Sequence, residues 1–181
     1  MERCDFIFSH SRYGNKTNNL IYRIKDFYTL FYYKFVDKLK TNDKHNWSHM
    51  QTLPQVRSWQ GFSFELLCLL HIEEIKNALG INVMLNSASS WRSKAGETGT
   101  QIDLVIDRAD RVTNICEIKF ATNVFAIDKA YEQKLRERMA IFTAETKTRN
   151  STVLTMITTF GVVSNKHSGV VNSQVLLDDL F

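Results

Sequence analysis

Three residues in two neighbouring segments have the types and the spacing needed to activate water next to a metal ion. Asp103 lies in the first segment, and Glu117 and Lys119 lie in the second. Apolar and polar side chains alternate in both segments, which predicts β-strands in which residues two apart share a face. If the strands pair through the turn between them, Asp103 and Glu117 converge across the ladder. Two close carboxylates repel each other and so favour a hard divalent cation, beside which a lysine can orient or deprotonate a water molecule.

The same alternation is also typical of a plain two-stranded ribbon with one solvated face. Glu65 favours the metal site over that ribbon. It is the only charged residue in residues 61–70, and a helix that is apolar nearly all round should be buried. A buried lone carboxylate is costly, so Glu65 should face a cation or a hydrogen-bond donor. A salt bridge to an arginine or lysine elsewhere in the chain would satisfy it as well.

The first part of the chain is rich in aromatic residues. Residues 5–9 and 20–24 are short extended runs on either side of a polar turn at 13–16, which predicts a hairpin. Asp26 is predicted to cap a helix that continues to about residue 40. Residues 41–57 are polar and contain the only proline of the chain, which predicts a linker or loop.

The remainder of the chain has a more regular pattern, and we expect it to form a second domain. The predicted division is 1–57 for the hairpin, aromatic helix and linker, and 58–181 for the second domain. The hydrophobic spacing predicts helix, three strands, helix and strand in that order. These elements are a helix at 62–79 ended by Gly80, strands at 82–92, 100–108 and 112–120, a helix at 127–144, a strand at 151–160, and a further strand and closing turn in the tail.

The composition is that of an ordinary globular protein, with 44% hydrophobic and 23% charged residues. The net charge of +4 fits an anionic partner such as nucleic acid but does not require one. Cys68 and Cys116 lie in apolar runs, which predicts buried thiols in a reducing compartment. The sequence has no signal-like start and no apolar run near the ~20 residues that span a bilayer, so we expect a cytoplasmic protein without membrane contact.

The acidic and basic residues singled out above also carry a family resemblance. Glu65 on a helix, Asp103 on a strand and the Glu117-Ile118-Lys119 triplet, in the order αβββαβ, resemble the PD-(D/E)XK phosphodiesterase superfamily. More narrowly, the chain is similar to the C-terminal nuclease-like domain that follows the ATPase and winged-helix domains of many bacterial and archaeal AAA-type ATPases. The matching segments are 20–26 with the following aromatic helix, 59–65, 99–108, 116–120, 155–161 and 177–181.

The resemblance implies a fold and a role for each matched residue. The fold would be α/β, with a restriction-endonuclease-like αβββαβ core, a mixed central sheet flanked by helices, and a preceding hairpin-helix remnant of a winged-helix module. Asp103 and Glu117 would bind Mg²⁺ or Mn²⁺ with the backbone carbonyl of Ile118. Lys119 would position the attacking water, and Glu65 would bind the metal directly or through water.

The chain also departs from the family pattern. Ile102 replaces the proline that gives the superfamily its name. The neighbouring Gln101 would be an accessory polar residue at the site. No G-x-x-x-x-G-K-[ST] motif is present, and residues 14–17 are predicted to be a turn rather than a phosphate-binding loop. We therefore expect a truncated relative or a piece of a longer protein, which an AAA-type ATPase could accompany.

Several basic residues near the expected site could bind phosphates. Arg92 and Lys94 lie in a glycine-containing loop and are the better candidates. Three further basic residues lie on the helix at 127–144 and could equally form a solvated face with the glutamates between them. They are Lys129, Lys134 and Arg138. Tyr131 shares the apolar face of that helix and is predicted to belong to the core.

Three functions fit the sequence. The first is metal-dependent hydrolysis of DNA, which the complete set of two carboxylates and a lysine favours. The second is a non-catalytic nuclease-like module that binds nucleic acid or a partner protein. The third is a fragment that acts through interactions of its N-terminal hairpin and helix, for example by forming a homodimer through the aromatic segment.

Overall fold

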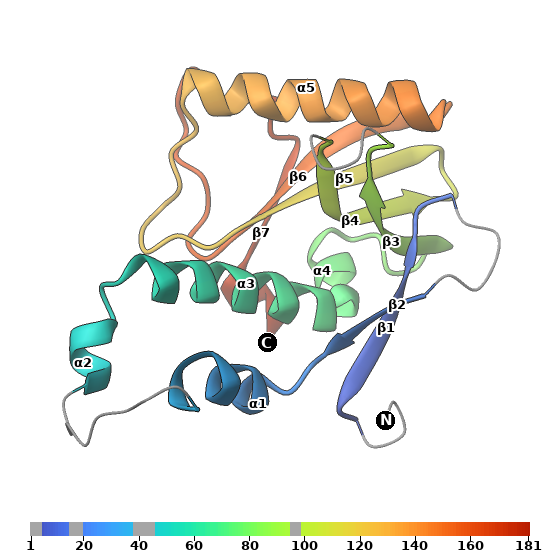
Figure 1. Ribbon diagram of the computed structural model, residues 1–181. Helices are drawn as coiled ribbons and strands as arrows, with labels where there is room; N and C mark the ends of the chain where they lie inside the picture. The colour runs from blue at the N-terminus through green and yellow to red at the C-terminus, as the bar shows by residue number, and fades with distance from the viewer. Residues whose placement is uncertain (1–4, 15–19, 38–45, 95–98) are drawn as a thin grey trace.

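A seven-stranded mixed sheet with the strand order β2-β1-β3-β4-β5-β6-β7 forms the centre of the protein. The computed structural model describes residues 5–14, 20–37, 46–94 and 99–181. Helix α5 covers one face of the sheet, and helices α1, α3 and α4 lie on the other (Figure 1). The fold is therefore α/β. No helix in the described part of the chain has the length and apolar character needed to cross a bilayer.

The element order predicted for the chain from β3 onward is confirmed. Strands β3, β4 and β5 are antiparallel neighbours, while β5–β6 and β6–β7 are parallel pairs. Parallel strands need a crossover connection, and α5 supplies it between β5 and β6. The bounds are β3 Asn86–Arg92, β4 Gln101–Arg108, β5 Val112–Lys119, α5 Lys129–Thr146, β6 Ser151–Thr158, β7 Ser173–Leu176 and a closing 3₁₀ turn at Leu177–Leu180.

Two hydrophobic cores lie on the two sides of this sheet. The α3-side core contains Phe64, Cys68, Cys116 and other apolar residues of α3, α4 and the strands. The α5-side core contains Phe142 and further apolar residues of α5 and the strands. Both cysteines are fully buried, as predicted, and burial raises the pKa of the Cys68 thiol to about 12. Such thiols act as small hydrophobic residues rather than as reactive groups.

The N-terminal hairpin is an integral part of the sheet. Strands β1 (Ile7–Arg12) and β2 (Leu20–Ile24) pair antiparallel, as predicted, and β1 also pairs in parallel with β3. Residues 15 and 16 of the predicted turn lie outside the described residues. Asp26 caps helix α1 (Phe27–Phe31) by accepting a hydrogen bond from the backbone N–H of Thr29 at 2.9 Å. A π-helical turn at Tyr32–Val36 follows, and the predicted end of this helix near residue 40 lies outside the described residues.

The predicted linker at 41–57 is wrong where the structure describes it. Helix α2 spans Asn46–Met50, and helix α3 begins at Pro54 and ends at Leu70. Proline favours the first turn of a helix because its missing N–H is not needed there, so Pro54 starts α3 instead of marking a loop. The expected domain boundary at 57/58 falls inside this helix.

The single helix predicted at 62–79 is in fact two helices. The chain breaks at His71, whose φ of −114° and ψ of 38° are not helical, and α4 then spans Ile72–Ala78. Gly80 ends α4 as predicted, with a φ of +67°. The N–H of Gly80 bonds to the carbonyl of Asn77 and the N–H of Ile81 bonds to the carbonyl of Lys76, at 2.9 Å each, which is a Schellman motif.

The Gly80→Ala variant should therefore be less stable than the wild type by about 1 kcal/mol, because alanine is strained at positive φ. No heavy atom lies within 4 Å of the added Cβ, so strain and not a clash is the cause. Gly61→Ala is the matched control. Gly61 lies inside α3 with equally open space, and alanine there should stabilise the protein by about 1 kcal/mol. Urea unfolding measures the change in the free energy of unfolding for both variants. A change of the same sign in the two variants would contradict the role of the positive φ of Gly80.

Candidate functional site

A β-bulge places the first of the predicted site residues. The register of β3 against β4 shifts between Ser89 and Trp91, so that Ser90 alone lies opposite both Asp103 and Leu104. A bulge adds one residue to a strand and can turn a side chain away from the regular alternation, and such irregularities are common next to active sites. Asp103 is thus positioned by a local distortion of β4.

The bulge corrects the predicted alternation of β4. Even-numbered residues were expected to share one face, and all three are buried. However, Ile102 packs in the α5-side core, whereas Leu104 and Ile106 pack in the α3-side core. The sequence pattern missed this change of face because it depends on the pairing of β4 with β3.

Asp103 lies in a largely buried position near two other carboxylates. Burial raises the pKa of its carboxyl group most, the charges of Glu65 and then of Glu117 also raise it, and Arg23 and Arg138 lower it, which together move the pKa from 3.8 to about 6. Gln101 donates a hydrogen bond to the carboxylate of Asp103 at 3.2 Å. The structure thus brings the influence of the other two predicted carboxylates to Asp103, and the effect of Glu65 is larger than that of Glu117.

Glu65 faces a cation, as its burial required. Arg23 of β2 donates from Nη1 to Oε1 of Glu65 at 2.6 Å, and the two side chains are 26% and 22% exposed. This ion pair is the salt bridge that the sequence left open as an alternative. Arg23 was not predicted. The alternation of β2 points the other way, since it predicts that Leu20, Tyr22 and Ile24 face the core, whereas in the structure these three are exposed and Arg23 is partly buried.

Helix α5 holds Glu117. Tyr131 donates its hydroxyl to Oε1 of Glu117 at 2.5 Å, and Arg138 donates to Oε2. The side chains of Arg138 and Glu117 are only 15% and 14% exposed. Burial, together with the Glu117 charge, raises the pKa of Tyr131 above its ordinary value, so Tyr131 stays a hydrogen-bond donor. Tyr131 packs partly against the α5-side core, as predicted, but its hydroxyl belongs to the site.

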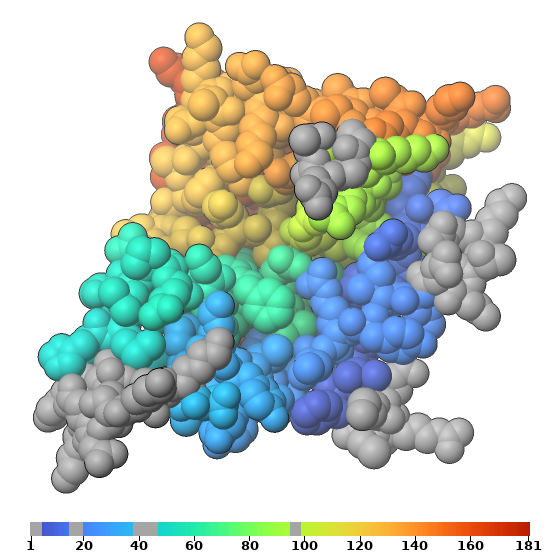
Figure 2. Space-filling model, in the orientation of Figure 1, coloured from blue at the N-terminus to red at the C-terminus, as the bar shows by residue number. Residues whose placement is uncertain are grey.

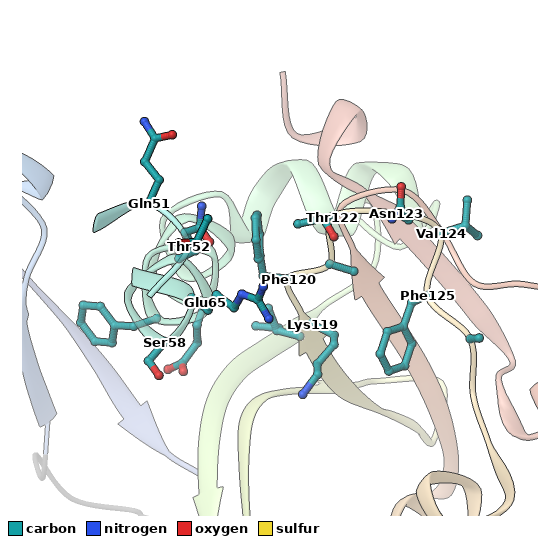
Figure 3. Close-up of a pocket in the computed structure, with 17 residues that line it drawn as sticks. Gln51, Thr52, Ser58, Glu65, Lys119, Phe120, Thr122, Asn123, Val124 and Phe125 are labelled. Carbon is teal, nitrogen blue, oxygen red and sulfur yellow. The ribbon is translucent and has the colours of Figure 1, made fainter. Parts of the chain in front are cut away.

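Lys119 lies on the same side of β5 as Glu117. Its Nζ is 5.6 Å from the centre of the Tyr131 ring, a cation–π contact. Cys116, Ile118 and Phe120 pack in or against the α3-side core, which confirms the predicted faces of β5. Lys119 also lines a cavity of about 1000 Å³ together with Glu65, Ile118 and the chain that follows β5. Figure 3 shows Glu65 on helix α3 on one side of this cavity and Lys119 with Phe125 on the other.

The donor set fits Mg²⁺ or Mn²⁺, which prefer oxygen ligands. Asp103 forms no ion pair of its own among the described residues. Its raised pKa reflects first its burial and then the repulsion by Glu65 and Glu117, and a bound cation would offset both. Within residues 5–14, 20–37, 46–94 and 99–181, no three acidic, histidine or cysteine side chains come together as a ready-made metal site. The reason is visible in the contacts, because Glu65 is turned to Arg23, and Glu117 to Arg138 and Tyr131.

The predicted phosphate-binding residues fall into two groups. Arg92 lines a small cavity together with Asp103, whereas Lys94 is exposed and donates its backbone N–H to Glu145 at 3.0 Å. Lys129 and Lys134 are exposed on α5 and contribute to neither cavity. The same helix carries side-chain pairs typical of a solvated face, among them Arg136–Glu132 at 2.7 Å and Gln133–Glu137 at 2.8 Å.

Comparison with known proteins identifies no family for the chain. No protein-family model matches the sequence, and no curated protein matches it. Among solved structures, the chain is similar to the crystal structure of a protein of unknown function, AF1548, with a TM-score of 0.42 and 14% sequence identity. The similarity covers 60% of this chain and 56% of that one. This level of similarity assigns neither a fold family nor a function.

Proposed function

We propose that the protein hydrolyses phosphodiester bonds of DNA in a metal-dependent reaction and that its core is of the restriction-endonuclease-like PD-(D/E)XK type. One observation carries this proposal. The Asp103 carboxyl group, whose pKa is about 6, lies where the charges of Glu65 and Glu117 act on it together. Lys119, on the same side of β5 as Glu117, adds the cationic group that a hydrolytic site of this kind needs. The order α4-β3-β4-β5-α5-β6 within the described part of the chain supports the fold assignment.

Each residue then has a role. Asp103 and Glu117, with the carbonyl of Ile118, would bind the cation, and Glu65 would bind it directly or through water. A bound Mg²⁺ or Mn²⁺ polarises a phosphoryl oxygen and lowers the pKa of a bound water. Lys119 holds the attacking water, while Tyr131 and Arg138 keep the Glu117 carboxylate in place.

A non-catalytic module that binds nucleic acid or a partner protein is the second candidate. The observation that favours it is the ion pairing of two of the three carboxylates, Glu65 with Arg23 and Glu117 with Arg138. A cation must compete with these arginines. The aromatic segment, with Tyr28 72% and Tyr33 63% exposed, supports the companion proposals of a homodimer or of docking to an AAA-type ATPase in the cytoplasm.

Incubation of purified protein with plasmid and single-stranded DNA tests the proposal. Cleavage should occur with Mg²⁺ or Mn²⁺ and stop when EDTA removes the metal. The Asp103→Asn variant, purified in the same way, controls for contaminating nucleases. Equal cleavage by the wild type and this variant would exclude the catalytic site, and no cleavage by the wild type with either metal would favour the binding module.

A further inference from the structure

A small cavity joins the N-terminal hairpin to the candidate site. It has a volume of about 170 Å³, and arginines from three strands, Arg12 of β1, Arg23 of β2 and Arg92 of β3, line it beside Asp103 and Gln101. In Figure 2 the blue atoms of the hairpin lie directly against green and yellow-green atoms of the middle of the chain, the part before residue 108 that contains β3. Parallel pairing of Ser11 with Ser89 and of Arg12 with Ser90 fixes the hairpin at this position.

The charges of this cavity are not balanced. Arg23 is shared with Glu65, and Asp103 is the one carboxylate in the lining. Neither Arg12 nor Arg92 forms an ion pair or donates a side-chain hydrogen bond within the described part of the chain, and both are exposed to solvent. The single carboxylate of Asp103 does not offset three guanidinium groups around one small space, so these groups repel one another unless a further anion lies between them. The cavity therefore has the electrostatic character of an anion site.

We propose that this cavity binds one phosphate group of the nucleic-acid substrate, and hence that the hairpin is part of the substrate site. The proposal rests on the proposed function only in naming nucleic acid as the source of the phosphate. Guanidinium groups match phosphate because their planar N–H donors bond two of its oxygens at once. The size agrees, since pockets for whole drug-sized ligands span roughly 300–1,000 Å³ and this one holds a single group.

The position next to Asp103 gives the bound phosphate a function. Lys119 and Glu65 line the large cavity, while Asp103 and Gln101 line the small one. The Arg23–Glu65 pair links the two, since Arg23 lines the small cavity and Glu65 the large one. A phosphate held by the three arginines would fix the strand next to the carboxylates and so determine which bond reaches them. Such positioning groups contribute to the rate through orientation.

Binding of a short single-stranded oligonucleotide, labelled at its 3′ end and measured by fluorescence anisotropy in EDTA, tests this proposal without cleavage. The Arg12→Gln/Arg92→Gln double variant should bind at least about tenfold more weakly than the wild type, because it loses two charged hydrogen-bond donors to the phosphate. Arg149→Gln, at an exposed position in the loop after α5, is the matched control and should bind like the wild type. The Arg12→Lys/Arg92→Lys variant keeps the positive charge, and its affinity should lie between those of the Gln double variant and the control. It tests the planar geometry of the guanidinium groups even if the Gln double variant unfolds.

Two further arms identify the source of the phosphate. If a 5′-phosphorylated oligonucleotide binds more tightly than its 5′-hydroxyl counterpart, and the double variant loses this difference, the cavity holds a terminal phosphate. If both oligonucleotides weaken equally in the double variant, it holds an internal one. Binding by the double variant that equals the control, or no binding by the wild type, overturns the proposal. This experiment measures binding and not cleavage. Its result therefore does not depend on whether the catalytic proposal is correct.

Discussion

The Asp103→Asn variant is expected to be more stable than the wild type above pH 6 and to cleave DNA at least ~100-fold more slowly. The stability gain follows from the pKa of Asp103, which folding raises from 3.8 to about 6. A raised pKa means that the folded state binds the proton more tightly than the unfolded state. The stability that this provides is present below about pH 4 and is lost as the pH rises to about 6.

The size of this effect can be bounded. The difference between 3.8 and about 6 corresponds to at most ~3 kcal/mol at pH 8, and mutual screening of the neighbouring charges reduces it. Asparagine is neutral at every pH, so the variant escapes this loss. We expect its melting temperature to exceed that of the wild type by about 2–6 °C at pH 8, with the difference shrinking towards zero at pH 4. The loss of cleavage follows because a neutral amide cannot replace a charged metal ligand.

Asp110→Asn is the matched control for this prediction. It makes the same substitution in the exposed turn of the same hairpin, where Asp110 pairs with Arg108. Its stability should change by less than ~1 kcal/mol with little dependence on pH, and cleavage should be unchanged. Thermal unfolding followed by circular dichroism at both pH values measures the stability. An Asp103→Asn protein that is less stable than the wild type at pH 8 would show that favourable interactions of the charged carboxylate outweigh the burial and repulsion that raise its pKa.

The sequence predicted those parts of the site that depend on local periodicity. Glu117 and Lys119 share one side of β5 because their strand alternates regularly between the two cores. The lone charge of Glu65 in an apolar helix correctly required a partner, since burial of an unpaired carboxylate is unfavourable. Both inferences need only the residues of one element.

The partners of these residues were beyond the sequence because they come from distant elements. Arg23, Tyr131 and Arg138 contact the predicted carboxylates through tertiary packing. Arg138 was considered as a phosphate-binding residue, and its position on α5 gave no sign that Glu117 would neutralise it. The bulge at Asp103 likewise depends on how β4 pairs with β3, which strand alternation alone does not encode.

The N-terminal part shows the opposite error, in which local composition misled. The polar residues and the proline before residue 58 suggested a linker, although Pro54 is the first residue of a helix. The hairpin, predicted as a remnant of another module, supplies Arg12 and Arg23 to the cavity beside Asp103. If the proposed phosphate site is correct, this hairpin cannot be removed without loss of substrate binding.

The Lys119→Met variant is expected to lose at least ~100-fold in DNA cleavage while it keeps its affinity for Mn²⁺. Lysine contributes to the reaction by placing a water molecule against phosphorus, and orientation of this kind contributes several kcal/mol to catalysis. It is not a metal ligand in this proposal, so Mn²⁺ binding measured by calorimetry should stay within about threefold of the wild type. The cation–π contact with Tyr131 contributes only about 0.5–1 kcal/mol, and methionine fills similar space, so the variant should fold.

Two controls separate a chemical role of Lys119 from a structural one. Lys166→Met makes the same change at an exposed position in the loop after β6 and should cleave like the wild type. Lys119→Arg keeps the charge, but its planar guanidinium group cannot reproduce the point donor of an ammonium, so cleavage should recover only in part. If Lys119→Met lowers Mn²⁺ affinity as strongly as it lowers cleavage, Lys119 acts by organising the carboxylates. If it cleaves like the wild type, the water-positioning role is wrong, and a group of the large cavity other than Lys119 must hold the water.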